Sequence, residues 1–246
     1  MKDGFIKVAA GTPDIRVADC EYNRAEITAL IDKAHAAGVR ILALPELCIT
    51  GYTCQDLFFQ QALLDGALNA LREITEHTAG SDMLISVGCP LRFRGELYNC
   101  AVVLKAGKIL GVVPKKFLPN YNEFYEKRHF TAAPEGQFDI ELFGESVPFG
   151  LGLLFECRAM PELVFAAELC EDVWTMDPPS VSHAKAGATV IANCSASDET
   201  TGKAGYRETL IAGQSARLVC AYIYANAGEG ESTQDLVFGG HDIIAE

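Results

Sequence analysis

The sequence predicts a layered α/β fold of the α+β kind, with helices and strands in turn along a chain of 246 residues. Apolar runs such as Val39 to Leu44 and Leu163 to Leu169 have the length of buried strands. Other segments carry apolar residues at helical spacing, as between Asp19 and Gly38. An expected hairpin argues against a purely parallel sheet. A chain of this length forms one large domain or at most two, and it shows no internal repeat or obvious linker.

The first half of the chain predicts a βαβ unit, a second helix and a hairpin. A strand at about Phe5 to Ala10 precedes a helix with Asp19 as its N-cap and Gly38 as its stop signal. The strand Val39 to Leu44 completes the unit. The elements expected next are a helix from about Asp56 to His77, a strand from Met83 to Val87, and the hairpin strands Leu97 to Leu104 and Ile109 to Val113.

The segment from Phe117 to Gly136 has no clean periodicity and is rich in Tyr, Phe, Asn and Glu. Such a loop is typical of a functional site, with a self-packed surface loop as the alternative. The elements expected after it are strands at Glu141 to Phe143, Leu151 to Phe155 and Leu163 to Leu169, a short helix near Ser180 to Ala186, a strand from Thr189 to Asn193, a helix from about Ala204 to Val219, a strand from Ala221 to Ala225, and a closing stretch, Asp235 to Phe238 and on to Ile244, that resembles a strand cut short.

The charge balance bears on the partners of the chain. Its 20 Lys and Arg residues against 33 Asp and Glu give a formal net charge of −13. Binding to nucleic acid or to an anionic membrane needs clustered basic residues, so we expect neither partner. The N-terminal apolar run is too short for a signal peptide core, and no stretch approaches the roughly 20 apolar residues of a membrane span.

The nine cysteines are an odd number and contain no Cys-x-x-Cys pair. Several of them lie inside strand-like runs, where small core residues belong. This pattern favours neither a zinc site nor the disulfide framework of a secreted protein. We therefore expect a protein of the reducing cytoplasm.

Three reactive side chains follow apolar strands: Glu46, Lys115 and Cys170. Because α/β folds collect their chemistry at strand ends, we expect these three at the rim of one active site. Taken singly, each has a plainer explanation, a core cysteine or a solvated charge. The acidic neighbours Glu171 and Asp172 disfavour a thiolate, so a reactive Cys170 requires a nearby base and a nearby cation.

The three side chains suffice for hydrolysis of an amide. Glu46 would take the proton of Cys170 as sulfur attacks the carbonyl carbon, and Lys115 would stabilise the thiolate and then the oxyanion. Glu46 would return the proton to the leaving amine, and water would cleave the thioester. We expect the backbone N–H of Glu171 to be a second oxyanion donor. None of the five histidines lies in a matching motif.

Three groups of motifs occur in a fixed order. They are Leu44-Pro45-Glu46-Leu47 with Thr50-Gly51-Tyr52, then Pro114-Lys115 with Leu118-Pro119-Asn120-Tyr121 and Glu123-Phe124-Tyr125-Glu126, then Glu168-Leu169-Cys170-Glu171-Asp172-Val173-Trp174. Together they resemble the nitrilase superfamily of carbon–nitrogen hydrolases over nearly the whole chain. Its general pattern has Cys-Tyr-Asp or Cys-Tyr-Glu at the nucleophile. The Cys-Glu-Asp-x-Trp sequence is most similar to the glutaminase domain of glutamine-dependent NAD synthetases.

The resemblance implies a role for each matching position. Glu46 is then the general base, Lys115 the oxyanion stabiliser, Cys170 the nucleophile, and Glu126 the second glutamate that steadies the lysine and the substrate. Lys116 competes for the lysine role, one position past the match. The residues implied at the substrate are Tyr121, Glu171, Ser197 and Lys203, with Tyr52, Phe124 and Trp174 at most forming pocket wall; ordinary loop packing is the alternative for these outer residues.

The resemblance also implies a four-layer αββα sandwich that assembles into a homo-oligomer through its helical layers. The sequence departs from the full synthetases because it lacks the Ser-Gly-Gly-x-Asp-Ser loop of their second domain, and Gly202-Lys203 fails the Walker pattern. We expect residues 1–246 to be one glutaminase domain, truncated before its last strands and the synthetase domain; the alternative is a protein without a synthetase. No cofactor is expected here, since ATP and Mg would belong to the missing domain.

Three functions follow as hypotheses. The first is a glutamine amidohydrolase that supplies ammonia for NAD synthesis by an attached synthetase domain. The second is a free-standing nitrilase-type amidase that acts on another small amide. The third, disfavoured because all three catalytic positions are filled, is a non-catalytic assembly domain.

Overall fold

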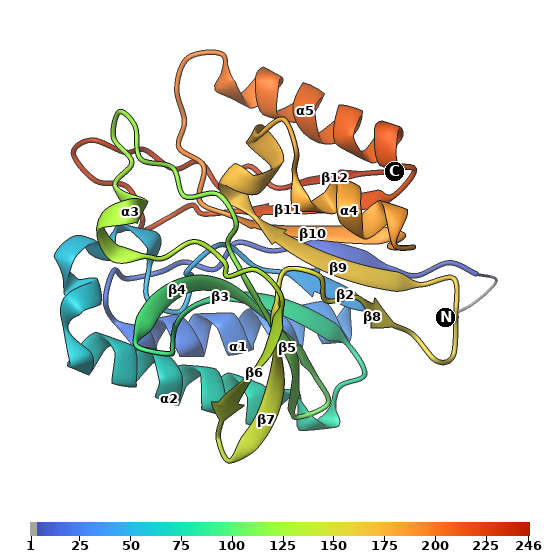
Figure 1. Cartoon of the computed structure of the whole chain (residues 1–246), viewed down its shortest axis with the longest axis horizontal. Coiled ribbons are helices and arrows are strands. Elements are labelled where there is room, and N and C mark those ends of the chain that lie inside the picture. The colour runs from blue at the N-terminus through green and yellow to red at the C-terminus, as the bar shows by residue number, and fades with distance from the viewer. Residues whose placement is uncertain (1–3) are drawn as a thin grey trace.

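Two β-sheets packed face to face form the centre of the computed structural model, which describes residues 4–246 (Figure 1). Within these residues, the seven-stranded sheet has the order β1 (Val8–Ala10), β2 (Ile41–Ala43), β3 (Leu84–Phe93), β4 (Glu96–Lys105), β5 (Lys108–Pro114), β7 (Glu145–Gly150) and β6 (Gln137–Leu142). The five-stranded sheet has the order β12 (Ile243–Ala245), β11 (Ala221–Asn226), β10 (Val190–Ser195), β9 (Val164–Leu169) and β8 (Phe155–Glu156).

Helices cover the outer face of each sheet (Figure 1). On the seven-stranded sheet lie α1 (Cys20–Ala36) and α2 (Gln61–His77), and on the five-stranded sheet lie α4 (Pro179–Lys185) and α5 (Lys203–Leu218). The short helical segments are η1 (Tyr52–Phe59), η2 (Thr78–Gly80), α3 (Glu126–His129) and η3 (Cys170–Trp174). The predicted four-layer αββα sandwich is therefore confirmed.

The strands alternate between two hydrophobic cores, as a side-chain period of two requires. On β4, Cys100 and Val102 face α1 and α2, whereas Ala101 and Val103 pack between the sheets. On β9, Phe165 and Ala167 also lie between the sheets. A third core joins β9, β10 and β11 to α5. Because burying one aliphatic side chain stabilises a fold by roughly 1.5–3 kcal/mol, these three interfaces hold the layers in register.

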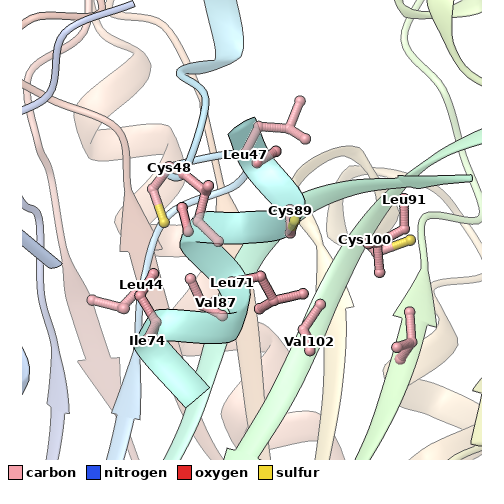
Figure 2. Packing of buried hydrophobic residues seen from close by; sticks show 14 of the residues in the cluster. Leu44, Leu47, Cys48, Leu71, Ile74, Val87, Cys89, Leu91, Cys100 and Val102 are labelled. Carbon is pink, nitrogen blue, oxygen red and sulfur yellow. The ribbon is translucent and has the colours of Figure 1, made fainter. Parts of the chain in front are cut away.

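Most of the cysteines are core residues, as the sequence predicts. Figure 2 shows Cys48, Cys89 and Cys100 among leucine and valine side chains of the core beneath α2. All nine cysteines are free thiols within the described residues, and Cys157 alone among them is not buried. Burial raises the pKa of the Cys89 and Cys100 thiols well above the ordinary value, so these thiols are unreactive.

The strand pairing is mixed, as expected. Neighbours β1, β2 and β3 pair in parallel, β3, β4 and β5 pair antiparallel, and β9, β10 and β11 are parallel. The last strand, β12, pairs antiparallel with β11. No helix in residues 4–246 is both long and apolar enough to cross a membrane.

Several predicted boundaries are wrong. The strand expected to end at Val87 continues to Phe93, because it pairs with β4 from Ile85 to its last residue, and the first strand begins at Val8 rather than near Phe5. α2 begins at Gln61 rather than near Asp56, because Gln60 has an extended backbone, with φ of −87° and ψ of 123°, which separates α2 from the 3-10 helix η1. The strand expected at Glu141 to Phe143 is part of the β6–β7 hairpin, which turns at Phe143 and Gly144 with φ of 55° and 81°. Leu151 to Leu154 form a turn and coil before the short β8, and Asp235 to Phe238 form no strand.

Candidate active site

Glu46 is held in a tight turn directly after β2. Its neighbour Leu47 has a positive φ of 50°, and its own backbone N–H donates to the Ser195 carbonyl at 3.3 Å across the two sheets. The turn lies against Gly88 of β3, where an added Cβ would stand 2.1 Å from the Leu47 nitrogen and 2.4 Å from the Pro45 oxygen. Only glycine fits there, so the close approach of β3 fixes the position of the Glu46 side chain.

Lys115 follows the last residue of β5 and is fully buried at its side chain. Its Nζ donates to Glu46 Oε1 at 2.6 Å and to Glu126 Oε1 at 2.5 Å. Burial alone would lower the pKa of Lys115, but Glu126 and Glu46 outweigh it and raise the pKa well above the ordinary value. The ammonium is therefore held charged between two carboxylates.

Glu126 is the first residue of α3 and comes from the segment that the sequence predicts as a functional loop. Its Oε1 also accepts a hydrogen bond from the Tyr52 hydroxyl at 2.8 Å. Burial raises the pKa of Glu126, with Lys115 opposing and Glu46 adding to the shift. Two buried carboxylates thus share one cation, which favours a proton on one of them near neutral pH.

Cys170 is buried at the end of β9, where η3 begins. Its φ of 32° is a left-handed conformation that non-glycine residues rarely adopt, and its N–H donates to Asn193 Oδ1 at 2.9 Å. Burial raises the thiol pKa and Glu46 raises it further, while Lys115 and the Ser195 hydroxyl oppose the shift. Cys170 is consequently a neutral thiol that needs a base to become a nucleophile.

The acidic neighbours of Cys170 do not crowd its sulfur, contrary to the expectation from sequence. Asp172 accepts hydrogen bonds from the backbone N–H groups of Leu169 at 3.0 Å and Phe117 at 2.8 Å. Glu171 accepts from the Tyr121 hydroxyl at 2.9 Å. The carboxylates that raise the thiol pKa are Glu46 and Glu126, from other elements. Asp172 instead ties the turn at the cysteine to the segment that follows Lys115.

The outer residues lie around this centre in two groups. Tyr121 and Glu171 contact each other; burial raises the pKa of Glu171, and the Tyr121 hydrogen bond and the charges of Lys115 and Lys203 oppose this shift. The Lys203 ammonium pairs with Asp198 and lies 5.6 Å from the Trp174 ring and 5.8 Å from the Phe124 ring.

Ser197, in the second group, is bound by side chains of β11 and α5. Ser197 is buried, its N–H donates to Asn226 Oδ1 at 2.8 Å, and its hydroxyl accepts from Arg207 at 3.3 Å. Lys116 points elsewhere: its ammonium lies 3.5 Å from Asp177 Oδ2 and remains partly exposed.

Three polar residues of this region escaped prediction from the sequence. Asn99 of β4 donates to Glu46 Oε1 at 2.6 Å, Asn193 of β10 binds the N–H of Cys170, and Ser195 lowers the thiol pKa. One signal was available in each strand, namely a polar side chain inside an otherwise apolar run. A buried polar group requires a partner, and here the partners are the reactive residues.

The fold and this polar centre define a class of protein. Two mixed sheets between helical layers, with a buried thiol beside a carboxylate–ammonium–carboxylate cluster at the strand ends, match a hydrolase of the nitrilase type. The model of the carbon-nitrogen hydrolase family matches residues 7–245. The chain belongs to this family, and it is an enzyme of the nitrilase type.

Two proteins with similar sequences are glutamine-dependent NAD(+) synthetases. The chain is 42% identical over 243 residues to the glutamine-dependent NAD(+) synthetase of Mycobacterium tuberculosis strain H37Rv, a match that spans 99% of this chain and 36% of the relative. The synthetase of Aquifex aeolicus is 32% identical, again with 36% of its length covered. The chain therefore spans about a third of the length of these relatives.

Solved structures agree with this fold. A glutamine-dependent NAD(+) synthetase from Cytophaga hutchinsonii superimposes with a TM-score of 0.87 and 33% identity, over 98% of this chain and 39% of the other. An amidase from Nesterenkonia sp. superimposes with a TM-score of 0.74 at 19% identity, over 99% of this chain and 83% of the other. At that identity the amidase supports the fold alone.

Proposed function

We propose that the chain hydrolyses the side-chain amide of glutamine, with Cys170 as nucleophile, Glu46 as general base and Lys115 as oxyanion stabiliser. The observation that carries the proposal is the buried Glu46–Lys115–Glu126 cluster, which acts electrostatically on the Cys170 thiol. A neutral thiol beside a carboxylate base suits a reaction in which the sulfur loses its proton only as it attacks.

The proposed reaction proceeds through a thioester. Glu46 takes the thiol proton while sulfur bonds to the amide carbon, and the oxyanion forms beside the Lys115 ammonium and the Glu171 N–H at the start of η3. Glu46 then gives the proton to nitrogen as the C–N bond breaks and ammonia leaves. Water, deprotonated by Glu46, attacks the thioester, and glutamate and the thiol are released.

The residues around the centre support glutamine as the substrate. An amino acid carries an ammonium and a carboxylate, and Glu171 and Lys203 offer the opposite charges within electrostatic range of each other. Tyr121 holds the Glu171 carboxylate, and the Ser197 hydroxyl, just after β10, accepts a hydrogen bond from Arg207 of α5. The similar proteins are glutamine-dependent, which is the same substrate class.

The ammonia would serve NAD synthesis by a synthetase domain of the same protein, to which residues 1–246 would be the glutaminase part. This proposal rests on the relatives, which are synthetases with about a third of their length covered by this chain. ATP and Mg would act in that other domain. A homo-oligomer joined through the helical layers and a cytoplasmic location are further proposals.

The test is the Cys170→Ala variant, assayed for release of glutamate from glutamine. We expect activity to fall to the background rate, because the nucleophile is lost. The matched control is Cys157→Ala, which removes a half-exposed thiol from the loop after β8. Full turnover by Cys170→Ala would refute the proposal.

A glutamine-directed electrophile adds a measurement that does not depend on turnover. We expect it to label Cys170 alone, as read by peptide mass, even if the isolated chain turns over slowly without its synthetase. Glutamine is then compared with a panel of ω-amides and carbamoyl compounds. Indifference to glutamine would favour the alternative, a free-standing amidase for another small amide.

A further inference from the structure

Asn99 bridges the two carboxylates that hold Lys115. Its amide nitrogen lies 2.6 Å from Glu46 Oε1 and 3.4 Å from Glu126 Oε2, while Lys115 donates to Oε1 of both. Two donors and two acceptors therefore close a ring. The backbone carbonyl of Asn99 also accepts a hydrogen bond from the backbone N–H of Lys115 at 2.8 Å. One residue of β4 therefore contacts every member of the cluster.

The orientation of the Asn99 amide follows from its neighbours. Both groups beside the amide nitrogen are carboxylate oxygens, which accept hydrogen bonds, so the amide must present its NH₂ to them. Its own oxygen is buried and has no hydrogen-bond partner among residues 4–246. A buried acceptor without a partner is unfavourable. The Asn99 side chain therefore leaves its amide oxygen without a partner while its NH₂ group donates to Glu46.

The donors on Glu46 are unequally divided between its two oxygens. Oε1 accepts from the Lys115 ammonium and the Asn99 amide, whereas Oε2 accepts one neutral bond, from the Ala196 N–H at 3.1 Å. The oxygen with the weaker and fewer donors keeps the more basic lone pair. Oε2 is therefore the better proton acceptor of the two.

We propose that Asn99 is a positioning residue that, together with Lys115, engages Oε1 of Glu46 and so reserves Oε2 to take the proton of Cys170. The inference rests on the proposed function, because it concerns the base of that reaction. Asn99 contacts no reacting atom in this scheme. It sets which oxygen of the base faces the reaction and keeps the carboxylate from turning about its last bond.

Loss of the Asn99 donor affects the pH profile as well as the rate. Asn99 also donates to Glu126, whose pKa burial already raises, so loss of this donor favours the protonated form of Glu126 further. Because Glu126 shares the Lys115 ammonium with Glu46, the acidic limb of the kcat profile then moves upward. The titratable groups that act on the Glu46 carboxylate are Lys115 of the β5 end, Glu126 of α3, Tyr52 of η1, Cys170 of η3 and Cys194 of β10. All of them are unchanged in the variants below.

The test compares Asn99→Leu, which keeps the side-chain size without a donor, with Asn99→Asp, which places an acceptor against two carboxylates. For Asn99→Leu we expect kcat to fall by about 10-fold to 100-fold with KM within about twofold, and the acidic limb to move up by roughly half to one pH unit. Asn99→Asp should fall further, because like charges then meet. Asn99→Ser, with a hydroxyl donor, should recover part of kcat.

The control is Asn23→Leu. Asn23 is as fully buried as Asn99, but its side chain binds only backbone groups, of Arg16 and Ile49. We expect this variant to lose stability in urea unfolding and to keep the wild-type pH limb. A pH limb in Asn99→Leu that matches both the wild type and the control would overturn the proposal, as would equal changes in kcat and KM.

Failure of the proposed function is distinguishable from failure of this inference. If the wild type acts on another amide and not on glutamine, the glutamine proposal fails, and the Asn99 variants are assayed with that amide. A crystal structure of Asn99→Leu tests the inference without turnover. We expect the carboxylate of Glu46 to rotate so that Oε1 and Oε2 no longer keep their separate partners, and an unrotated carboxylate would overturn the inference.

Discussion

At the scale of single residues, Glu46 has two opposing effects on Cys170. Its negative charge raises the thiol pKa and so disfavours the thiolate at rest. In the proposed reaction the same carboxylate removes the thiol proton. A substitution at position 46 therefore separates the two roles. Loss of the charge changes the rate of thiol alkylation, whereas loss of the base changes the rate of glutamine hydrolysis.

The Glu46→Gln variant should lose glutamine hydrolysis and gain reactivity toward a simple alkylating agent. Without the general base, kcat is expected to fall by about 10²-fold to 10⁴-fold. Alkylation of Cys170 by iodoacetamide proceeds through the thiolate, so its rate at pH 7.5 should rise when the charge that raises the thiol pKa is removed. The two rates are measured on the same preparation, by glutamate release and by peptide mass.

The control for this pair of measurements is Glu168→Gln. Glu168 is equally buried but lies on the helix-facing side of β9, where its carboxylate accepts from Ser180 and Tyr222. We expect it to leave the alkylation rate within about twofold of the wild type. Parallel loss of hydrolysis and alkylation in Glu46→Gln would mean that the substitution merely disorders the site.

Only some residues of the site could be predicted from the sequence, for a physical reason. Glu46, Lys115 and Cys170 stand at strand ends, where side chains leave the core, so their type and place are both informative. Asn99 and Asn193 lie inside β4 and β10, and their value depends on which carboxylate or N–H at the end of another strand of the same sheet lies within reach. The partners are distant in the sequence, so a single chain read from end to end does not show which groups will meet.

At the scale of elements, the turn after β2 depends on β3. Gly88 is the only described glycine whose added Cβ would meet three backbone atoms of the Pro45–Leu47 turn, the closest at 2.1 Å. The Gly88 carbonyl also accepts from the Ile49 N–H at 3.4 Å. The position of the proposed base, Glu46, is thus set by a glycine 42 positions further along the sequence.

The Gly88→Ala variant should move this turn. We expect a loss of about 1–3 kcal/mol in the free energy of unfolding, because a methyl group is forced into packed backbone. We also expect kcat to fall by at least about 10-fold, because a shift of the order of 1 Å in a catalytic group is costly. Urea unfolding and glutamate release measure the two effects.

Gly213→Ala is the matched control for that change. Gly213 lies exposed in the middle of α5, and an added Cβ there meets no atom within 4 Å. Alanine at a helix interior is favoured over glycine by roughly 0.5–1 kcal/mol, so the control should gain stability and keep its activity. A Gly88→Ala variant that behaves like the control would contradict the close approach of β3 to the turn.

The accuracy of element prediction followed the strength of the local pattern. α1 and β9 begin or end within two residues of expectation, since periodic apolar residues and clear stop signals mark them. The β6–β7 hairpin was missed although Phe138, Ile140 and Leu142 alternate with polar residues, because its strands lie at the edge of the sheet and half of their residues face solvent. A short alternation of that kind is weak evidence by itself.

At the scale of the whole molecule, buried carboxylates outnumber buried cations that could balance them. Glu126, Glu168, Asp172 and Glu231 are buried, and burial raises the pKa of each above its ordinary value. Hydrogen bonds from backbone and hydroxyl groups offset part of this cost. The folded chain therefore holds protons that the unfolded chain releases near pH 4.

Stability should consequently fall as the pH rises above neutrality. A carboxyl group whose pKa is raised by folding contributes stability below its unfolded pKa, and that contribution is lost as the pH rises through the folded pKa. For one proton retained by the native state, the free energy of unfolding falls by about 1.4 kcal/mol per pH unit, so we expect a loss of roughly 1–2 kcal/mol between pH 6.5 and pH 8.0. Urea midpoints across this range measure it.

The range is chosen so that other groups do not reverse the sign. His183 has a pKa lowered by burial, which favours stability at higher pH, but only below its ordinary value of 6.5. Hydrogen bonds from Arg128 and Lys105 lower the pKa of Asp56 and Asp82, respectively. The contribution of these two carboxylates to stability therefore changes only in more acidic solution. Between pH 6.5 and 8.0 the buried carboxyl groups contribute to the slope, and toward the upper end of this range the buried thiols, whose pKa burial also raises above the ordinary value of about 8.5, act in the same direction.

Surface repulsion offers a different cause for the same trend, since the chain carries a formal net charge of −13. Salt separates the two causes, because it screens exposed charges far more than buried ones. If the buried carboxyl groups are responsible, the slope persists in about 0.5 M NaCl, and Glu126→Gln makes it shallower, because burial raises the pKa of Glu126 to about 7, inside the tested range. A slope that disappears in salt and is unchanged in Glu126→Gln would assign the effect to the surface instead.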